Sequence, residues 1–442
     1  MKVKLLRPKG DQVIWILVLL FAMISILAVF SSSTYRANTN DVTKVSLFFE
    51  QIRFVLLGFL TMFVCYALPT RFYRNIAFLA FAASIVLLIM TFIPHFSHRI
   101  NGAVRGVKIA GIPIQVFELA KVGLVIYLAR ALEFWKDSLD TFKDFFLKLL
   151  LPIIAVCGLV MANSFSSAIL FGLISFALLY FMGVKVKFLL ISLAGAAVAV
   201  VLLFGVYNVA FAGRQHPEGY QPNTVEKLFN RFGTVQSRFE KFFDDIGGAE
   251  SEEEEFLTKE DKMRHLDEIR QSENAKVAIS EGGLLGKGPG KSTQRYSLSM
   301  AFSDFIFAFI VEEYGFFGGA FVILLYTIFL FRCIRISQKC QSTFASSLVL
   351  GLAFLLAIQA MLHIFVNVRL IPITGHTLPL ISHGGTAYII LSGAFGMILS
   401  ASRQADEQIR RQEMLAREQA SELQEPAEDT LADTTDNNEE DF

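Results

Sequence analysis

The segment Gln271–Gly319 reads QSENAKVAISEGGLLGKGPGKSTQRYSLSMAFSDFIFAFIVEEYGFFGG. Its first half is polar and rich in glycine and basic residues. Its second half has an apolar helical pattern, with Asp304 at the start and Glu312 and Glu313 inside. Carboxylates are costly in so apolar a segment, and within a membrane they mark candidate functional groups. We therefore expect the rest of the chain to be a membrane scaffold that presents this segment at one side of a bilayer.

The composition of the whole chain supports this expectation. The chain has 442 residues, of which 54% are hydrophobic and only 18% are charged, and its mean hydropathy is +0.51. These values predict an all-α polytopic membrane protein. The first apolar run is long enough to span a bilayer, so no cleavable signal peptide is predicted. The four cysteines lie in or beside apolar runs and indicate neither a disulfide framework nor a metal site.

Ten apolar segments predict ten transmembrane helices. They cover residues 13–30, 54–68, 77–93, 116–132, 143–161, 167–182, 188–206, 304–331, 346–366 and 386–401. The predicted parts are an N-terminus (1–12), spans one to seven (13–206), a large extracytoplasmic loop (207–300), spans eight to ten (301–403) and an acidic tail (404–442). We expect the tail to be disordered, and we expect the acidic run Asp244–Glu255 to be a solvated insertion.

Lysine and arginine in the short loops predict the orientation of the chain. They occur at the N-terminus, in the loops 71–74, 185–187 and 332–339, and at the start of the tail. With ten spans these segments all lie on one side, so both termini are predicted to be cytoplasmic. The remaining loops, at 32–52, 94–114, 207–300 and 367–385, then face outward. Asp304 is therefore expected at the outer surface of the membrane.

The first of three outward polar patches contains Arg105, Lys108, Glu118 and Lys121. Glu118 and Lys121 are three residues apart on one predicted helix face, so their side chains can pair. Two interpretations stay open. The pair is either a buried ion pair that locks two helices together, or part of a cationic wall for an anionic lipid head group.

The second patch runs from the glycine cluster at 282–290 through Gln294 and Arg295 to Asp304. Glycines alone are weak evidence, because they also serve turns. Asp304 has two interpretations, either a helix N-cap or a chemically active carboxylate. Glu312 lies near the helix face of Asp304 whereas Glu313 points away. One of these two glutamates is therefore predicted to be a hydrogen-bond partner inside the bundle.

The third patch is the segment 367–386, NVRLIPITGHTLPLISHGGT. Prolines and glycines between apolar spans predict a re-entrant or tightly folded loop that is buried in protein. Arg369 and Ser382 supply hydrogen-bond donors at the predicted outer surface. The spacing of His376 and His383 is not diagnostic of a metal site, so we expect these histidines to form hydrogen bonds.

These patches together resemble the SEDS family of bacterial membrane proteins (FtsW, RodA and SpoVE), and within it the FtsW group, over about residues 13–403. The matching elements are Asn101-Gly102-Ala103 with Arg105, Glu118-Leu119-Ala120-Lys121, Ala275–Gln294, Ser303-Asp304-Phe305-Ile306 with Glu312-Glu313, and Pro372 through Thr386. The sequence departs from the family pattern at Gly106, Thr374 and His383, where tryptophan, lysine and tyrosine are usual. None of these departures touches Asp304.

The resemblance implies a peptidoglycan glycosyltransferase in the bacterial plasma membrane. Its substrate would be lipid II, an undecaprenyl-diphosphate-linked disaccharide pentapeptide, polymerised on the outer face of the membrane at the division septum. It also implies two kinds of partner, a class B penicillin-binding protein with transpeptidase activity and the divisome proteins. No nucleic-acid partner is expected.

This reaction inverts the anomeric carbon, so it needs a base for the acceptor hydroxyl and cations for the leaving diphosphate. Asp304 is the predicted base. The predicted substrate-binding residues are Arg105, Lys108, Glu118, Lys121, Gln294, Arg295, Arg369 and Ser382. No cofactor is predicted, and the sequence gives no indication of a divalent metal.

Two other classes of protein stay open. Ten spans with charges between helices also suit a flippase for a lipid-linked precursor, although no internal repeat is visible and the polar patches lie on one face. A non-catalytic scaffold of a cell-wall synthesis complex is the other. If the chain works beside a class B penicillin-binding protein, as the resemblance implies, a helix of that partner is expected to pack on the eighth and ninth spans, where Gly315, Gly318 and Gly319 allow close approach.

Overall fold

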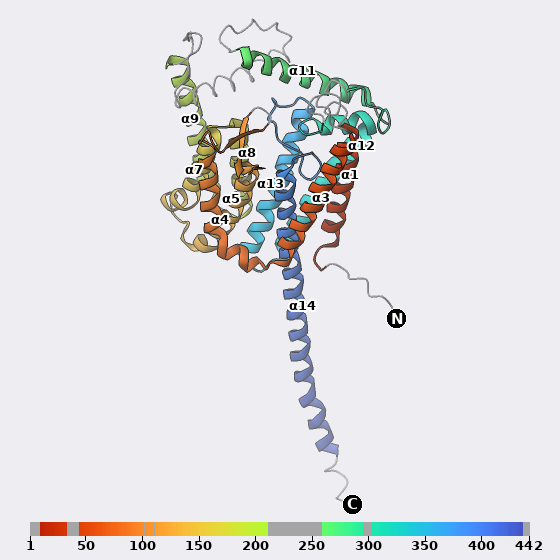
Figure 1. The fold of residues 1–442 in the computed structure, drawn as a ribbon. Coiled ribbons are helices and arrows are strands. Elements are labelled where there is room, and N and C mark those ends of the chain that lie inside the picture. The colour runs from red at the N-terminus through yellow and green to blue at the C-terminus, as the bar shows by residue number, and fades with distance from the viewer. Residues whose placement is uncertain are drawn as a thin grey trace, which may run out of the picture.

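The computed structural model describes residues 9–32, 44–100, 103–109, 111–210, 259–294 and 302–435. The acidic run 244–255, the rest of the loop between 211 and 258, and Arg295 lie outside these ranges. Figure 1 shows a bundle of long helices, with α11 (Lys259–Gly282) crossing one end and α14 (Thr386–Thr435) leaving from the other.

A helix lies over most of each of the ten predicted spans. The elements of the first seven are α1 (Gln12–Ser32), α3 (Lys44–Ala67), α4 (Thr70–Met90), α5 (Val116–Trp135), α6 (Phe142–Phe145) continued through η2 (Phe146–Leu150) into α7 (Leu151–Met161), α8 (Phe165–Phe181) and α9 (Val186–Ala210). The last three are α12 (Ile306–Lys339), α13 (Thr343–Asn367) and α14, and a short 3-10 turn, η1 (Lys136–Ser138), follows α5.

Six of these helical segments in the described ranges are long and apolar enough to cross a membrane. They are α1, α3, α4, the run Phe142–Met161, α12 and α13. The helices α8 and α9 add shorter apolar stretches, at Phe165–Phe181 and Val186–Leu202. The chain is therefore a mostly helical membrane protein with several membrane-spanning segments.

A small antiparallel sheet corrects the prediction that the chain is all-α. Its strands β1 (Ser97–Ile100), β2 (Ala103–Ile109) and β3 (Ile112–Ile114) pair in the order β1-β2-β3. Val107 is the partner of both Ser97 and Ile114, so β2 is the central strand. The sheet lies in the connection between α4 and α5, at the end of the bundle that α11 crosses (Figure 1).

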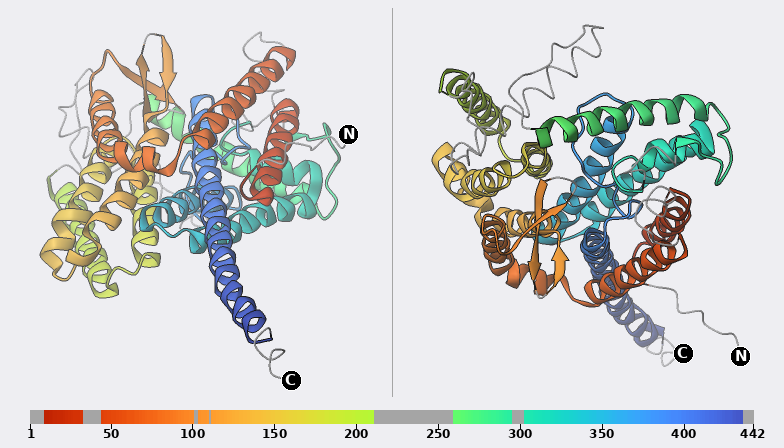
Figure 2. Two further views of the ribbon diagram at one scale, coloured as in Figure 1. Left: turned by 90° about the horizontal axis from the view of Figure 1, so that it is seen from below. Right: turned by 45° about the horizontal axis from the view of Figure 1, so that its top comes forward.

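The bundle is built around α13, which packs against α5, α8, α12 and α14. The helix α14 packs along α3 (Figure 2), and small residues make that contact close. A side chain at Gly396 would collide with the carbonyl oxygen of Met62, and one at Gly58 would press on Ser392 and Tyr388. Glycines at helix contacts are expected where apolar lipid gives helices little hydrophobic reason to associate.

The basic loops gather at the end of the bundle from which α14 leaves. There Lys9 pairs with Glu407 at 3.3 Å, Arg332 pairs with Asp11, and Lys185 pairs with Asp140 at 3.1 Å. The helix α14 continues beyond these contacts to Thr435, so residues 404–435 of the tail that we expected to be disordered are helical in the structure.

Candidate active site

Asp304 lies in a turn directly before α12, and only 7% of its surface is exposed. The N-cap of the helix is Phe305, whose side chain makes no capping hydrogen bond. The sequence had offered Asp304 itself as the N-cap, but the helix begins one residue later than that interpretation requires. The buried carboxylate therefore stands beside the start of the helix rather than at its cap position.

The backbone around Asp304 is held by the last residue of α13 and by the segment that follows it. Three successive carbonyl oxygens, those of Phe302, Ser303 and Asp304, each accept a hydrogen bond. The donors are the backbone N–H of His383 at 2.9 Å, the hydroxyl of Ser382 at 2.7 Å and the side-chain amide of Asn367 at 3.0 Å. Two segments far apart in the sequence thus form one continuous polar structure.

Ser382, predicted to bind substrate, is engaged within the chain. Its hydroxyl accepts from the backbone N–H of Leu378 at 2.8 Å while it donates to Ser303, and it is 2% exposed. His383 contacts the side chain of Gln51 through Nδ1 at 2.7 Å, and Gln51 donates to Ser25 at 2.8 Å. The prediction that the histidines here form hydrogen bonds is thus met at His383.

The second patch folds around the two glutamates of α12, which are 0% and 1% exposed. The carboxylate of Glu312 accepts from Lys287 Nζ at 2.9 Å, from Thr293 N at 2.8 Å and from the hydroxyl of Ser292. The same carboxylate accepts from the backbone N–H of Gln294 at 3.3 Å. The Glu312 carboxylate is therefore the common hydrogen-bond acceptor for several groups of the glycine-rich loop. One of these groups is the backbone N–H of the predicted site residue Gln294.

Glu313 bonds to a different part of the chain. Its Oε1 accepts from the hydroxyl of Ser31 on α1 at 2.5 Å and from the backbone N–H of Gly290 at 2.8 Å. One glutamate was predicted to be a hydrogen-bond partner inside the bundle, and both fill that role. At the solvent side of the loop, Lys287 also pairs with Glu281, and this hydrogen bond holds the pKa of Glu281 below its usual range.

The glycine-rich loop also supplies hydrogen-bond partners to the backbone of α12 where that helix is interrupted. Gly315 has φ 68° and ψ −167°, so the helix is interrupted there. The carbonyls of Glu312 and Glu313 accept from the N–H groups of Lys287 and Gly288, both at 2.9 Å. The N–H groups of Phe316 and Phe317 donate to the carbonyls of Gly283 and Leu284, at 2.9 and 3.5 Å. The backbone groups of Glu312, Glu313, Phe316 and Phe317, beside the break, thus find partners in the loop, as an apolar environment requires.

In the first patch, Glu118 and Lys121 form a buried ion pair. Their side chains are 2.8 Å apart, with 8% and 1% exposed. Lys121 also donates to Gln359 on α13, whose amide donates to the carbonyl of Thr377 at 3.1 Å. This geometry favours the interpretation of an ion pair that locks helices together, because it ties α5 to α13 and to the connection after α13.

The other predicted cations are spread around the same end of the bundle. Lys108 is exposed on β2, and the backbone of Arg105 belongs to the same strand, whereas the Arg105 side chain lies outside the described part of the structure. Arg369 has a left-handed backbone (φ 58°), and its guanidinium donates to Glu273 of α11 at 2.7 Å. Arg369 thereby links α11 to the connection that holds the Asp304 turn.

The helix α11 covers the candidate site. Its Ala275 and Ala278 pack with Phe305, Phe309 and Val366 in a small apolar cluster. Gln115, directly before α5, donates from its side chain to the carbonyl of Gly384 at 2.9 Å, so the sheet is joined to the same region. The structure therefore brings parts of all three polar patches to one end of the bundle.

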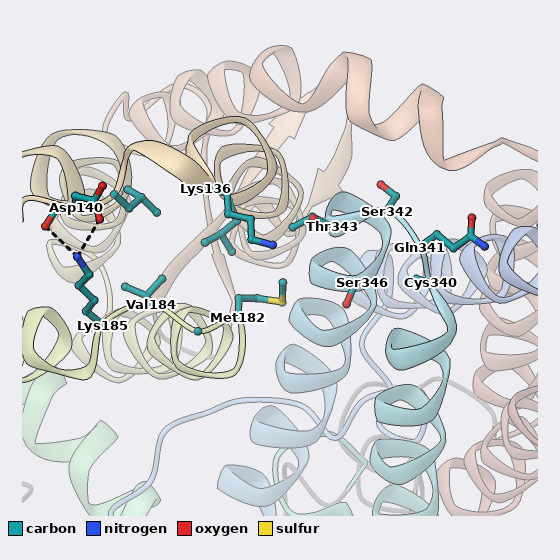
Figure 3. A pocket seen from close by; sticks show the side chains of 13 residues that line it. Lys136, Asp140, Met182, Val184, Lys185, Cys340, Gln341, Ser342, Thr343 and Ser346 are labelled. Atoms are coloured by element: carbon teal, nitrogen blue, oxygen red, sulfur yellow. Dashed lines mark hydrogen bonds and ion pairs between the residues drawn. The ribbon is translucent and has the colours of Figure 1, made fainter.

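A cavity of about 420 Å³ lies at the opposite end (Figure 3). It is bordered by Lys136, by the Asp140–Lys185 pair and by Ser342 and Thr343 at the start of α13. None of the predicted site residues lines it. Within the described residues, no group of three or more His, Cys, Asp or Glu side chains is placed to hold a metal ion.

Asn367 and Gln359 were missed by the sequence analysis. Both are 0% exposed polar residues of the largely apolar α13. Gln359 donates to Thr377 in the connection that follows the helix, and Asn367 donates to the carbonyl of Asp304. A polar side chain in an apolar span was the available signal. An uncharged amide stands out less in an apolar span than a charged group does, because its burial costs less free energy.

A helical bundle with a buried carboxylate and clustered polar loops at one end defines a polytopic membrane protein with a site near one membrane surface. The model of the cell cycle protein family that includes FtsW, RodA and SpoVE matches residues 11–239 and 255–407. The chain belongs to this family, which confirms the resemblance seen in its motifs.

Curated relatives and solved structures agree with this membership. A probable peptidoglycan glycosyltransferase FtsW of Enterococcus hirae is 28% identical over 418 residues, which are 92% of this chain and 96% of the relative. The protein of the same name from Bacillus subtilis is 29% identical over 406 residues, 90% of this chain and 92% of the relative.

The fold is similar to that of a chain in a peptidoglycan synthase complex that coordinates polymerization and crosslinking, with a TM-score of 0.65 and 21% identity over 90% of this chain and 98% of that one. It is also similar to the Thermus thermophilus rod shape determining protein RodA, with a TM-score of 0.58 and 21% identity over 90% of this chain and 97% of that one.

Replacement of Gly315 by alanine tests the backbone pairing between the glycine-rich loop and the interrupted helix α12. The new Cβ would collide with the carbonyl of Leu284, and the φ of 68° and ψ of −167° lie in a backbone region open essentially to glycine alone, which costs another residue about 1–3 kcal/mol. We expect Gly315→Ala to lower the unfolding temperature of the purified protein and to make the loop more sensitive to trypsin at Lys287 and Lys291. Gly172→Ala in α8 is the control, because its Cβ meets nothing within 4 Å. Equal behaviour of the two variants would contradict the role given to Gly315.

Proposed function

We propose that this protein is an inverting peptidoglycan glycosyltransferase that polymerises lipid II on the outer face of the bacterial plasma membrane. Membership of the family and the names of the curated relatives support this proposal. The observation that carries it is Asp304, a buried carboxylate in a turn whose three successive carbonyls accept hydrogen bonds from Asn367 at the end of α13 and from Ser382 and His383 in the segment that follows. A rigidly held carboxylate is suited to remove the proton of an acceptor hydroxyl.

The proposed topology has ten spans, with both termini in the cytoplasm and the loop 207–300 outside. It is supported by the basic residues at the end of the bundle where Lys9 and Glu407 meet, since such residues favour the cytoplasmic side. The candidate site then lies outside, where the lipid-linked disaccharide is polymerised. We place the protein at the division septum, with divisome proteins as partners, because the relatives carry the FtsW name.

The flippase and scaffold alternatives gain no comparable support. A translocation path needs polar groups through the depth of the bundle. Here the polar clusters around Asp304, Glu312 and Ser382 gather at one end.

The proposed glycosyl transfer also needs cations that stabilise the leaving diphosphate. We assign this role to Arg105, Lys108, Arg295 and Arg369, whereas Lys121 is engaged by Glu118 and Gln359 in the interior of the bundle.

A class B penicillin-binding protein is the proposed partner, supported by the likeness to a chain in a peptidoglycan synthase complex. The expected partner face on Gly315, Gly318 and Gly319 needs correction. The space beside them is taken by this chain, at Leu284, Tyr314 and Val311 respectively. We assign the contact instead to the exposed apolar face of α12, formed by Phe316, Phe317, Phe321 and Leu324.

The double variant Phe316→Ala, Phe317→Ala tests this partner face. Loss of two exposed aromatic side chains is expected to reduce co-purification with the penicillin-binding protein several-fold, since large aromatic residues dominate interface energies. The control is Leu190→Ala, Leu193→Ala on α9, where the leucines are about as exposed, at 61% and 59%. Unchanged association of the α12 variant would move the interface to another face.

Cysteine labelling tests the orientation. In a background without the native cysteines, a cysteine at Lys291 should react with an impermeant thiol reagent added to intact cells, and a cysteine at Arg417 should not. Both positions are exposed, so reactivity reports the side of the membrane. The opposite pattern would invert the topology and place Asp304 in the cytoplasmic leaflet.

Asp304→Asn tests the proposed activity. The change keeps the size and the backbone contacts of Asp304 but removes its ability to accept a proton. Lipid II polymerisation by the purified protein is expected to fall about 10²–10⁴-fold, which is the usual contribution of a positioned base, while the protein accumulates normally. Asp140→Asn, at an exposed aspartate of the opposite end, is the control and should polymerise like the wild type. Normal activity of a folded Asp304→Asn would exclude Asp304 as the base.

A further inference from the structure

Asn367, the last residue of α13, uses both ends of its side-chain amide. Its Nδ2 donates to the carbonyl of Asp304 at 3.0 Å and to the carbonyl of His363 at 2.8 Å. Its Oδ1 accepts from the backbone N–H of Ala308 at 2.9 Å. The residue is 0% exposed, so these bonds do not compete with water.

The two contacts with the α12 region lie on either side of the helix start. Ala308 belongs to the first turn, whose N–H groups have no partner within the helix. The N-cap residue Phe305 offers no side-chain acceptor, and Asn367 supplies one from the neighbouring helix. The same amide holds the carbonyl of Asp304, so a single side chain fixes the chain both before and after the turn.

The position of the Asn367 amide is itself fixed. The hydrogen bond to His363, one turn earlier on α13, determines which way the amide faces. His363 in turn contacts the carbonyl of His376 through Nδ1 at 2.8 Å. Through Asn367, the Asp304 turn is therefore held in a fixed position relative to the buried helix α13.

We propose that Asn367 is a positioning residue for Asp304: by holding the Asp304 carbonyl and the first turn of α12 together, it fixes the direction in which the carboxylate is presented. This inference rests on the proposed glycosyltransferase activity. A base acts only within hydrogen-bond reach of the proton that it removes. A displacement of about 1 Å can reduce a rate about 10²-fold.

Two substitutions separate positioning from helix capping. Asn367→Ala removes the donor and the acceptor. Asn367→Asp keeps an acceptor for Ala308 but places an oxygen against the Asp304 carbonyl. With purified full-length protein and lipid II, we expect both variants to lose about 10–10²-fold in kcat, with KM for lipid II changed less than about twofold. If capping alone mattered, Asn367→Asp would keep the wild-type kcat.

Asn163→Ala is the matched control. Asn163 is a buried asparagine (8% exposed) between α7 and α8, and it donates to Thr91, directly after α4, at 3.0 Å. We expect it to lower the unfolding temperature as Asn367→Ala does, and to leave kcat unchanged. An equal loss of kcat in the control would show a general effect of destabilisation and would overturn the proposal.

The remaining outcomes are also decisive. Wild-type kcat in Asn367→Ala would overturn the proposal directly. Failure of both Asn367 variants to accumulate, while Asn163→Ala accumulates, would assign Asn367 to folding instead of positioning. If the wild-type protein itself made no glycan from lipid II, the proposed function would fail, and this result is distinguishable because it appears before any variant is compared.

Discussion

The interruption of α12 at Gly315 is the constraint on which the candidate site depends. In an apolar environment the backbone groups released by a broken helix must bond elsewhere, because each unsatisfied group costs several kcal/mol. The chain meets this requirement with residues 283–288, which pair with Glu312, Glu313, Phe316 and Phe317. The position of the glycine-rich loop follows from this pairing. The buried Glu312 then accepts hydrogen bonds from Ser292 and Thr293, which fixes the loop beyond this pairing.

A second set of hydrogen bonds joins the backbone next to Asp304 to the segment that follows α13. The segment after α13 cannot form regular structure, because it contains prolines and glycines between two spans. Its Ser382 and His383 instead bond to the carbonyls of Ser303 and Phe302, which are also outside regular structure. Two irregular segments thereby satisfy each other. The Glu118–Lys121 pair stabilises this arrangement from α5, through Gln359 and Thr377.

Hydropathy predicted the positions of the helices along the sequence well, because a membrane-spanning helix requires a continuous run of apolar residues. The site was predicted less completely. Asp304, Glu312 and Glu313 were found because charge is conspicuous in an apolar segment. The partners of Glu312 were not, since they are side-chain and backbone groups of the glycine-rich loop whose positions depend on the fold. The sheet at 97–114 was missed because its short strands were read only as a connecting loop.

The glycines show most clearly why the sequence alone was insufficient. Gly315 and Gly319 were interpreted as space for another protein, yet a pattern of small residues does not say whose atoms approach it. In the fold that space is filled by Leu284 and Val311 of the same chain. Likewise, nothing in the sequence pairs Asn367 with Asp304, 63 positions earlier.

The pairing of residues 283–288 with 312–317 also restricts how the sequence can change in length. Two carbonyls and two N–H groups of the broken helix each meet one particular backbone group of the loop, so an inserted or deleted residue between Gly283 and Gly288 would shift the pairs that follow it out of alignment. A substitution there can preserve backbone pairing, whereas a change of length cannot. Natural variants of this protein should therefore tolerate replacements at Leu285, which is 82% exposed, while keeping the number of residues in this loop constant.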